Sequence, residues 1–116
     1  MEARKIIITG GATRIGAAIA KKLSGPNKEI TIHYNQSKSK AERLKKTLQK
    51  FGTIVYLVKG DLSKEREIHK LVKFSKSKMK FFDCLINNAS LFENDKLENF
   101  SSSSWEKHIS TNLKAP

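Results

Sequence analysis

The sequence is poor in cysteine, proline and long apolar runs. Its 116 residues include one cysteine, Cys84, and two prolines, so an internal disulfide is excluded. No apolar run approaches the roughly 20 residues that a membrane-spanning helix needs, and the N-terminal run is too short for a signal peptide. These absences predict a protein of a reducing compartment, with the cytoplasm as the default location and no membrane partner. We expect Cys84 to pack as a small core residue.

Acidic residues are also few: 11 Asp and Glu stand against 23 Lys and Arg, a formal net charge of +12. An excess of this size is typical of proteins that bind nucleic acid, a membrane surface or an acidic protein. The cations are mostly lysines, spread from Lys21 to Lys107 with acidic residues between them, and solvated helix surfaces produce the same distribution. We expect most of the excess to be helix surface, with no nucleic-acid partner.

The remaining composition is that of a globular protein, with 38% hydrophobic residues and a length that allows one core at most. Short β-rich apolar runs alternate with longer amphipathic segments. Strands are expected over residues 5–9, 29–34, 53–59 and 82–87, and helices over 14–24, 37–51, 63–78 and 104–113. The alternation predicts a Rossmann-type, doubly wound parallel α/β sheet with right-handed crossovers.

Within the predicted helices, apolar residues recur at helical spacing and mark the side expected to face the sheet. These residues are Ile15, Ala18, Ile19 and Leu23, then Ala41, Leu44 and Leu48, then Ile68, Leu71 and Val72. Ser63 is expected to be the N-cap of the third helix.

Ligands of such a sheet bind at the carboxyl ends of the strands, so the loops after the strands carry the candidate site. The first loop, residues 9–16, reads TGGATRIG. A strand followed by glycines and a helix start presents backbone N–H groups and the positive helix end to a phosphate. On its own, this glycine loop is equally consistent with a simple turn.

The other loops are polar. No Asp or Glu lies between Thr31 and Ala41, which favours NADP over NAD because a carboxylate there would repel a 2′-phosphate. Asp61 could accept a hydrogen bond from adenine or lie near the positive end of the next helix. Residues 87–90, NNAS, could tie neighbouring strands together and leave room for a flat ligand, or form an Asx turn.

Taken in order, these motifs resemble the N-terminal half of the short-chain dehydrogenase/reductase family, whose pattern is TGxxxGxG, D-[LV], NNAG and a later Asn. Here they stand as residues 9–16, 61–62, 87–90 and Asn112. Arg14 replaces the middle glycine and Ser90 the last one. Together with HYxxS at residues 33–37, these departures are similar to the pteridine-reductase branch, which uses NADPH.

The resemblance implies a strand order of 3-2-1-4, an NADP site and a small-molecule substrate, without a metal. It implies these cofactor-binding residues: Gly10, Thr13, Arg14, Ile15, Gly16, Asn35, Ser37, Asp61, Leu62, Asn88, Ala89 and Ser90. Arg14, Asn35 and Ser37 would face the 2′-phosphate. Phe92 matches a substrate-stacking Phe, although ordinary packing of a loop aromatic explains it as well.

Of the family's catalytic residues, the resemblance assigns only Asn112 here. The Ser and the helical YxxxK would follow Pro116, so we expect residues 1–116 to be the N-terminal part of one NADP-binding Rossmann domain, inactive alone. Tyr34 and Lys38 also read YxxxK, but they lie at a strand end and in a loop, so a catalytic role is not expected.

The function expected of the whole enzyme is NADPH-dependent hydride transfer to a C=O or C=N group, with a pteridine-like substrate first and a homo-oligomeric assembly. A second reading is a 3-oxoacyl-carrier-protein reductase, whose acidic carrier would suit the charge. Two readings from other classes are a basic nucleic-acid-binding module and a non-catalytic NADP-binding protein. With strand four at a sheet edge, we expect the isolated piece to associate or to be poorly soluble.

Overall fold

In the computed structural model of the chain, the described residues are 4–90 and 102–116. The elements follow in the order β1 (Lys5–Ile8), α1 (Arg14–Leu23), β2 (Glu29–Tyr34), α2 (Lys38–Lys50), β3 (Ile54–Lys59), α3 (Glu65–Met79), β4 (Cys84–Ile86) and α4 (Ser102–Ile109), which continues as a π-helix, η1 (Ser110–Lys114). The predicted alternation of strands and helices is confirmed. The fourth strand is shorter than expected, and the last helix starts two residues earlier and ends as a π-helix.

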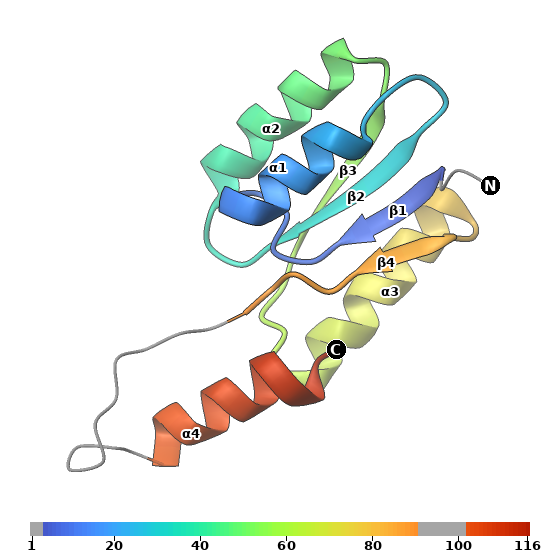
Figure 1. Cartoon of the computed structure of the whole chain (residues 1–116). Coiled ribbons are helices and arrows are strands. Elements are labelled where there is room, and N and C mark those ends of the chain that lie inside the picture. The colour runs from blue at the N-terminus through green and yellow to red at the C-terminus, as the bar shows by residue number, and fades with distance from the viewer. Residues whose placement is uncertain (1–3, 91–101) are drawn as a thin grey trace.

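The four strands are parallel and lie in the order β3-β2-β1-β4, as the resemblance implies (Figure 1). Lys5 of β1 is paired with Glu29 of β2, and Ile6 of β1 with Cys84 of β4. The chain thus starts in the middle of the sheet, moves outward to β3 and then crosses back to the other side of β1. That reversal beside β1 is the switch point where ligands bind in open parallel sheets.

The helices form two layers, with α1 and α2 on one face of the sheet and α3 on the other (Figure 1). Because side chains alternate along a strand, neighbouring isoleucines of β1 serve different layers. Ile6 and Ile8 belong to the cluster that includes Leu48 of α2, whereas Ile7 belongs to the cluster that includes Leu71 of α3. A continuous apolar strand is therefore needed at the centre of the sheet.

Three of the apolar helix residues expected to face the sheet are exposed. On α1, Ile15 is 70% exposed and Ala18 is exposed, while Gly16 and Ala20 are buried. The smallest residues make this contact because α1 approaches the sheet closely beside the first loop. On α3, Val72 is 38% exposed although Leu71 is buried as expected. The apolar spacing thus predicted the helices correctly but did not predict which residues at the margin of the buried face of α1 and of α3 are exposed.

The prediction that Ser63 caps the third helix is wrong. Helix α3 begins at Glu65, and the preceding residue, Lys64, makes no side-chain capping hydrogen bond. The Ser63 hydroxyl instead donates to Oδ1 of Asp61 at 2.7 Å, and the Ser63 backbone N–H donates to the same oxygen at 3.0 Å. The Asx turn built by Asp61 thus takes up the hydroxyl that the cap would have used.

Strand β4 lies at one edge of the sheet. Among the described residues, β1 is the only strand that pairs with it. Leu85, opposite Ile7 in the ladder, is 47% exposed, and Cys84 is half-buried against the cluster that includes Ile6. Cys84 thus packs at the margin of the core rather than inside it. The edge leaves an apolar side chain and a row of backbone groups accessible.

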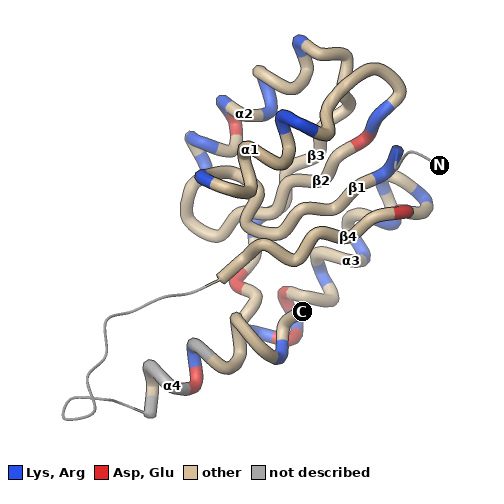
Figure 2. Tube along the Cα trace, in the orientation of Figure 1, with Lys and Arg blue, Asp and Glu red and all other residues tan. Residues whose placement is uncertain are grey.

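The cations are distributed over α1, α2 and α3 rather than gathered at the carboxyl edge of the sheet (Figure 2). On α2, for example, Lys38, Lys46 and Lys50 are exposed, while its Leu44 and Leu48 are buried. None of the helices in the described part of the chain is long and apolar enough to cross a membrane.

Candidate functional site

The loops after β1 and β4 meet at the switch point, and two glycines in the first loop make the contact possible. Gly10 has a φ of +62°, and a Cβ there would lie 2.9 Å from Cα of Ala89 in the fourth loop. A Cβ on Gly16, in the first turn of α1, would lie 2.6 Å from Nδ2 of Asn88 and would collide with the carbonyl oxygen of Gly10. Any side chain at Gly16 would therefore push α1 off the loop.

The N-terminus of α1 opens beside these glycines. Thr13 precedes the helix in an extended conformation and its side chain makes no capping hydrogen bond. The first-turn N–H groups, including that of Ile15, are therefore not taken by a cap and can bind an anion. Arg14, the first helical residue, is exposed and has a φ of 51°, in the left-handed region. That conformation explains why the family pattern has glycine at this position.

Thr9, the residue after β1, binds the fourth loop. Its Oγ1 accepts hydrogen bonds from the backbone N–H groups of Asn88 and Ala89, both at 3.0 Å, and donates to the carbonyl oxygen of Ile86 at 3.4 Å. Because Thr9 is only 5% exposed, it makes these bonds away from bulk water. One buried hydroxyl thus holds the end of β4 against the end of β1.

Asn88 completes the junction. Its Nδ2 donates to the carbonyl oxygen of Gly10 at 3.0 Å. The side chain of Thr9 in the first loop and the side chain of Asn88 in the fourth loop thus both join the two loops. The expectation that an asparagine of the NNAS segment ties neighbouring strands together is confirmed, and Asn88 is that asparagine.

His33, near the end of β2, joins the first loop to the third loop, which follows β3. The Gly10 N–H donates to His33 Nδ1 at 3.0 Å, and His33 Nε2 lies 2.7 Å from the carbonyl oxygen of Gly60. The backbone of His33 adds a third bond, because its carbonyl oxygen accepts from the N–H of Gly11 at 3.0 Å. Since Nδ1 accepts and Nε2 faces an acceptor, the ring is neutral with its proton on Nε2.

Burial keeps His33 neutral. The residue is 3% exposed, and desolvation lowers the pKa of His33 below its usual value, against opposing contributions from the Gly60 carbonyl and from Asp61. A protonated ring would lose the Gly10 bond because Nδ1 could no longer accept. The histidine therefore acts as a fixed link between loops.

In the third loop, Asp61 is held by Ser63. The side-chain and backbone hydrogen bonds from Ser63 lower the pKa of Asp61, so the carboxylate is charged at neutral pH. Leu62, in contrast, is 7% exposed and packs beside Ile7 and Leu71. Any contact between Leu62 and a nucleotide would thus use its backbone, whereas Asp61 presents its side chain.

The second loop leads from β2 into α2. Asn35 is exposed and Ser37, which precedes α2, is half-buried with no side-chain capping bond. The Gly60 N–H donates to the carbonyl oxygen of Tyr34 at 3.0 Å, so the second and third loops also run side by side. The polar groups of this loop are therefore placed to meet the part of a ligand that extends toward β3.

The remaining predicted residues lie outside this junction. Ser90 is exposed at the end of the described fourth loop, and Asn112 is exposed on η1. Phe92 lies outside the described residues. Tyr34 ends β2 and Lys38 begins α2, so this pair does not share one helix, as expected.

Thr9 and His33 are site residues that the sequence motifs did not identify as such. Both are polar residues at the end of an apolar strand, where a buried polar group must find a hydrogen-bond partner. That signal was present in the sequence. The partners, however, come from other strands, so only the assembled sheet identifies them.

This junction has the features of a dinucleotide-binding site: an uncapped helix start, close-packed glycines and polar loops at a switch point. Within residues 4–90 and 102–116, no group of three or more His, Cys, Asp or Glu could hold a metal ion. The chemistry that the arrangement supports is anion and nucleotide binding.

Comparison with known proteins agrees with this geometry. The chain is 27% identical over 111 residues to the 3-oxoacyl-[acyl-carrier-protein] reductase FabG of Staphylococcus epidermidis, a match that covers 96% of this chain and 46% of that enzyme. Among solved structures, it is similar to FolM alternative dihydrofolate reductase 1 from Brucella canis complexed with NADP, with 32% identity and a TM-score of 0.86 over 97% of this chain and 46% of that one.

A short chain dehydrogenase from Burkholderia cenocepacia J2315 in complex with NADP shares the fold, with a TM-score of 0.91 at 24% identity, over 97% of this chain and 46% of that one. The chain thus spans about half the length of the relatives it matches. The family model for short chain dehydrogenases matches residues 4–116, and the protein therefore belongs to the short-chain dehydrogenase family.

Proposed function

We propose that this chain is the NADP-binding part of an NADPH-dependent short-chain reductase. The observation that carries the proposal is the junction of the first and fourth loops, in which Asn88 is hydrogen-bonded to Thr9 and Gly10 beside the uncapped start of α1. The cofactor-bound relatives add support, since FolM from Brucella canis is in complex with NADP.

The residues present fit the cofactor part by part. The N–H groups at the start of α1, around Thr13 and Ile15, would hold the pyrophosphate. Asp61 and the backbone of Leu62 would contact the adenine. Asn88, Ala89 and Ser90 would line the ribose on the nicotinamide side.

Selectivity for the 2′-phosphate rests on the second loop and on Arg14. The guanidinium of Arg14 is exposed at the start of α1 and can form charge-assisted hydrogen bonds to a phosphate. Asn35 and Ser37 supply neutral donors, and the absence of a carboxylate between Thr31 and Ala41 removes the group that would repel it.

When bound, the dihydronicotinamide supplies a hydride to a C=O or C=N carbon. The residues of this chain bind the cofactor and orient its reactive face. In the family, a Tyr donates the proton and a Lys lowers the pKa of that Tyr. We propose that those groups belong to a longer protein of which residues 1–116 are the N-terminal part, and that Asn112 serves the same proton relay there.

The substrate class proposed first is a pteridine. Arg14 and Ser90 replace two family glycines as in the pteridine-reductase branch, and the similar FolM protein is an alternative dihydrofolate reductase. The second candidate is a 3-oxoacyl group on a carrier protein, which the relative from Staphylococcus epidermidis reduces according to its name.

Cofactor binding is tested by titrating the chain with NADPH and with NADH and following the fluorescence of the reduced nicotinamide. Charge-assisted bonds contribute about 1.5–3 kcal/mol, so we expect NADPH to bind about tenfold more tightly or better. Equal affinities would contradict the assignment of Arg14 and Ser37. Steady NADPH oxidation by this chain alone, with dihydropterin or a ketone, would contradict its assignment as the cofactor-binding part only.

The substrate is tested on a protein that also carries the family's Ser and YxxxK helix, comparing kcat/KM for dihydropterin and for a 3-oxoacyl thioester. A higher value for dihydropterin is expected. A higher value for the thioester would favour the second candidate while leaving the NADPH proposal intact.

A further inference from the structure

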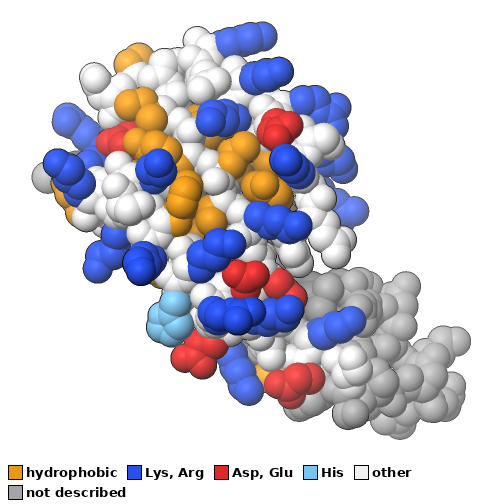
Figure 3. Space-filling view, turned by 180° about the vertical axis from the view of Figure 1, so that it is seen from behind, with side chains coloured by type: hydrophobic (Ala, Val, Ile, Leu, Met, Phe, Trp, Pro, Cys, Tyr) orange, Lys and Arg blue, Asp and Glu red, His pale blue; other side chains and the backbone are white. Residues whose placement is uncertain are grey.

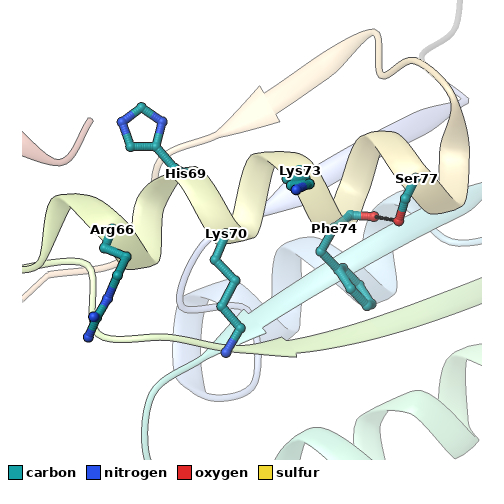
Figure 4. A pocket seen from close by; sticks show the side chains of 6 residues that line it. All are labelled: Arg66, His69, Lys70, Lys73, Phe74 and Ser77. Atoms are coloured by element: carbon teal, nitrogen blue, oxygen red, sulfur yellow. Dashed lines mark hydrogen bonds between the residues drawn. The ribbon is translucent and has the colours of Figure 1, made fainter.

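A shallow hollow of about 410 Å³ lies on the outer side of α3, away from the proposed cofactor site. Its lining comes from one helix: Arg66, His69, Lys70, Lys73, Phe74 and Ser77 (Figure 4). None of these residues has a role in the loops described above. The hollow is therefore a second surface feature, independent of the cofactor.

The hollow combines cations with an apolar floor. Arg66, Lys70 and Phe74 follow one another at four-residue intervals and point to the same side of α3 (Figure 4). The Phe74 ring is half-buried against the core cluster on this side of the sheet, so its position is fixed by packing. The Nζ of Lys78 also lies over this ring, 5.9 Å from its centroid. An apolar group bound at Phe74 would thus be surrounded by positive charge.

Part of this charge has no ion-pair partner among the described residues. Neither Arg66 nor Lys73 forms an ion pair with a carboxylate in the described part of the structure. Lys70 lies 3.9 Å from the half-buried Glu67, and His69 lies 3.5 Å from the exposed Glu65; ion pairs at a protein surface have little strength. The view from behind shows Lys and Arg side chains interspersed with apolar patches on this side of the molecule (Figure 3).

We propose that this hollow docks an acidic amphipathic helix of another protein. Carboxylates four residues apart on that helix match the spacing of Arg66 and Lys70, because such residues are neighbours on a helix surface. One apolar side chain between them would lie on Phe74. Opposite charge would set the orientation and the association rate of the docked helix.

Nucleic acid fits the hollow less well. Single strands bind by stacking bases on exposed aromatic faces, and Phe74 is half-buried against the core.

The probe is a synthetic helical peptide with glutamates at i, i+4 and i+7 around one leucine, titrated against the whole chain by fluorescence anisotropy. The test variant is Arg66→Glu with Lys73→Glu. The matched control is Lys46→Glu with Lys50→Glu on α2, which makes the same change in net charge on exposed residues of another face. All four substitutions are on the surface, and thermal melting verifies that each variant is folded.

We expect the α3 variant to bind the peptide about tenfold more weakly or worse and the α2 control to change affinity less than about threefold, since close charge pairs outweigh distant ones. Replacing the peptide leucine by serine should weaken binding by about threefold or more. Equal losses in the two variants would show attraction by net charge alone and would overturn the proposal. Tighter, steeply salt-dependent binding of labelled single-stranded DNA that the α3 variant abolishes would overturn it in favour of nucleic acid.

Addition of NADPH separates this proposal from the cofactor site. Because the hollow shares no residue with the loops at the switch point, the peptide affinity should be the same with and without NADPH. A chain that bound no NADPH but still bound the peptide through α3 would refute the proposed function, and the docking proposal for α3 would still hold.

Discussion

The backbone N–H of Gly10 donates to Nδ1 of His33 at 3.0 Å, across the two central strands of the sheet. The opposite ring nitrogen lies 2.7 Å from the carbonyl oxygen of Gly60. A side chain of β2 thus spans from the glycine loop after β1 to the loop after β3. The bond to Gly10 needs a neutral ring, so the junction depends on pH.

Acid should destabilise the chain through His33. Its pKa is lowered in the folded state, so between the folded pKa and the unfolded value of about 6.5 the unfolded chain binds more protons. The stabilisation is fully present above about pH 6.5 and is lost, by about 1.4 kcal/mol per pH unit, as the pH falls toward the folded pKa. Thermal melts from pH 8 to 5 measure the change.

Nitrogen-15 NMR of the imidazole rings provides the direct check. His33 should show the tautomer with its proton on Nε2 and a pKa below the ordinary histidine value of about 6.5. A His33 pKa above about 6.5 would contradict the bonding described here.

Removing the Thr9 hydroxyl should loosen the junction between β1 and β4. Thr9→Val keeps the shape but leaves the N–H groups of Asn88 and Ala89 without their acceptor, which costs about 1–3 kcal/mol of unfolding free energy. Denaturant unfolding measures the loss. Thr47→Val is the matched control, because the Thr47 hydroxyl only donates to the Arg43 carbonyl within α2, and it should change the unfolding free energy by less than about 0.5 kcal/mol.

Gly16→Ala should destabilise the fold and weaken NADPH binding together. Its Cβ would lie 2.6 Å from Asn88 Nδ2 and 2.8 Å from Cα of Gly11, so α1 must shift at a cost of about 1–3 kcal/mol. Gly60→Ala is the control, since the nearest atom to its Cβ is 3.7 Å away. Equal melting temperatures for the two variants would count against the close contact at Gly16.

Arg14→Gly should change stability and cofactor selectivity in opposite directions. Glycine relieves the left-handed strain at φ 51° and should raise the unfolding free energy by up to about 1 kcal/mol. The loss of the guanidinium should reduce NADPH affinity about tenfold while leaving NADH affinity nearly unchanged. Retained preference for NADPH would assign the 2′-phosphate contact to other residues.

The edge strand should make the chain associate. Leu85 is 47% exposed on β4, and an exposed edge with apolar side chains is a site for pairing between copies. Leu85→Lys should shift the sedimentation profile toward the monomer, whereas Ser39→Lys on α2, with the same added charge, should not. A wild-type chain that remains monomeric at high concentration would contradict this expectation.

The sequence was sufficient for the fold because the apolar patterns of strands and of helices are both local. Strands and helices alternate along the chain, and the strands are continuous apolar runs, which are typical of a sheet covered on both faces. Parallel strands then place all their carboxyl-end loops at one edge of the sheet. The candidate loops around Gly10, Asp61 and Asn88 followed directly from that rule. The errors at Ile15, Val72 and Ser63 arose where a close helix–sheet contact or a competing Asx turn decided the outcome.

By itself, the sequence determined the order of the elements, the glycine loop and the acid-free second loop. Only the tertiary structure decided how the loops are held together. Thr9 is bonded to Asn88 across 79 positions of sequence, and Gly10 to His33 across 23. Such partners depend on strand order and register, and a buried polar group shows its need for a partner but not which residue meets it.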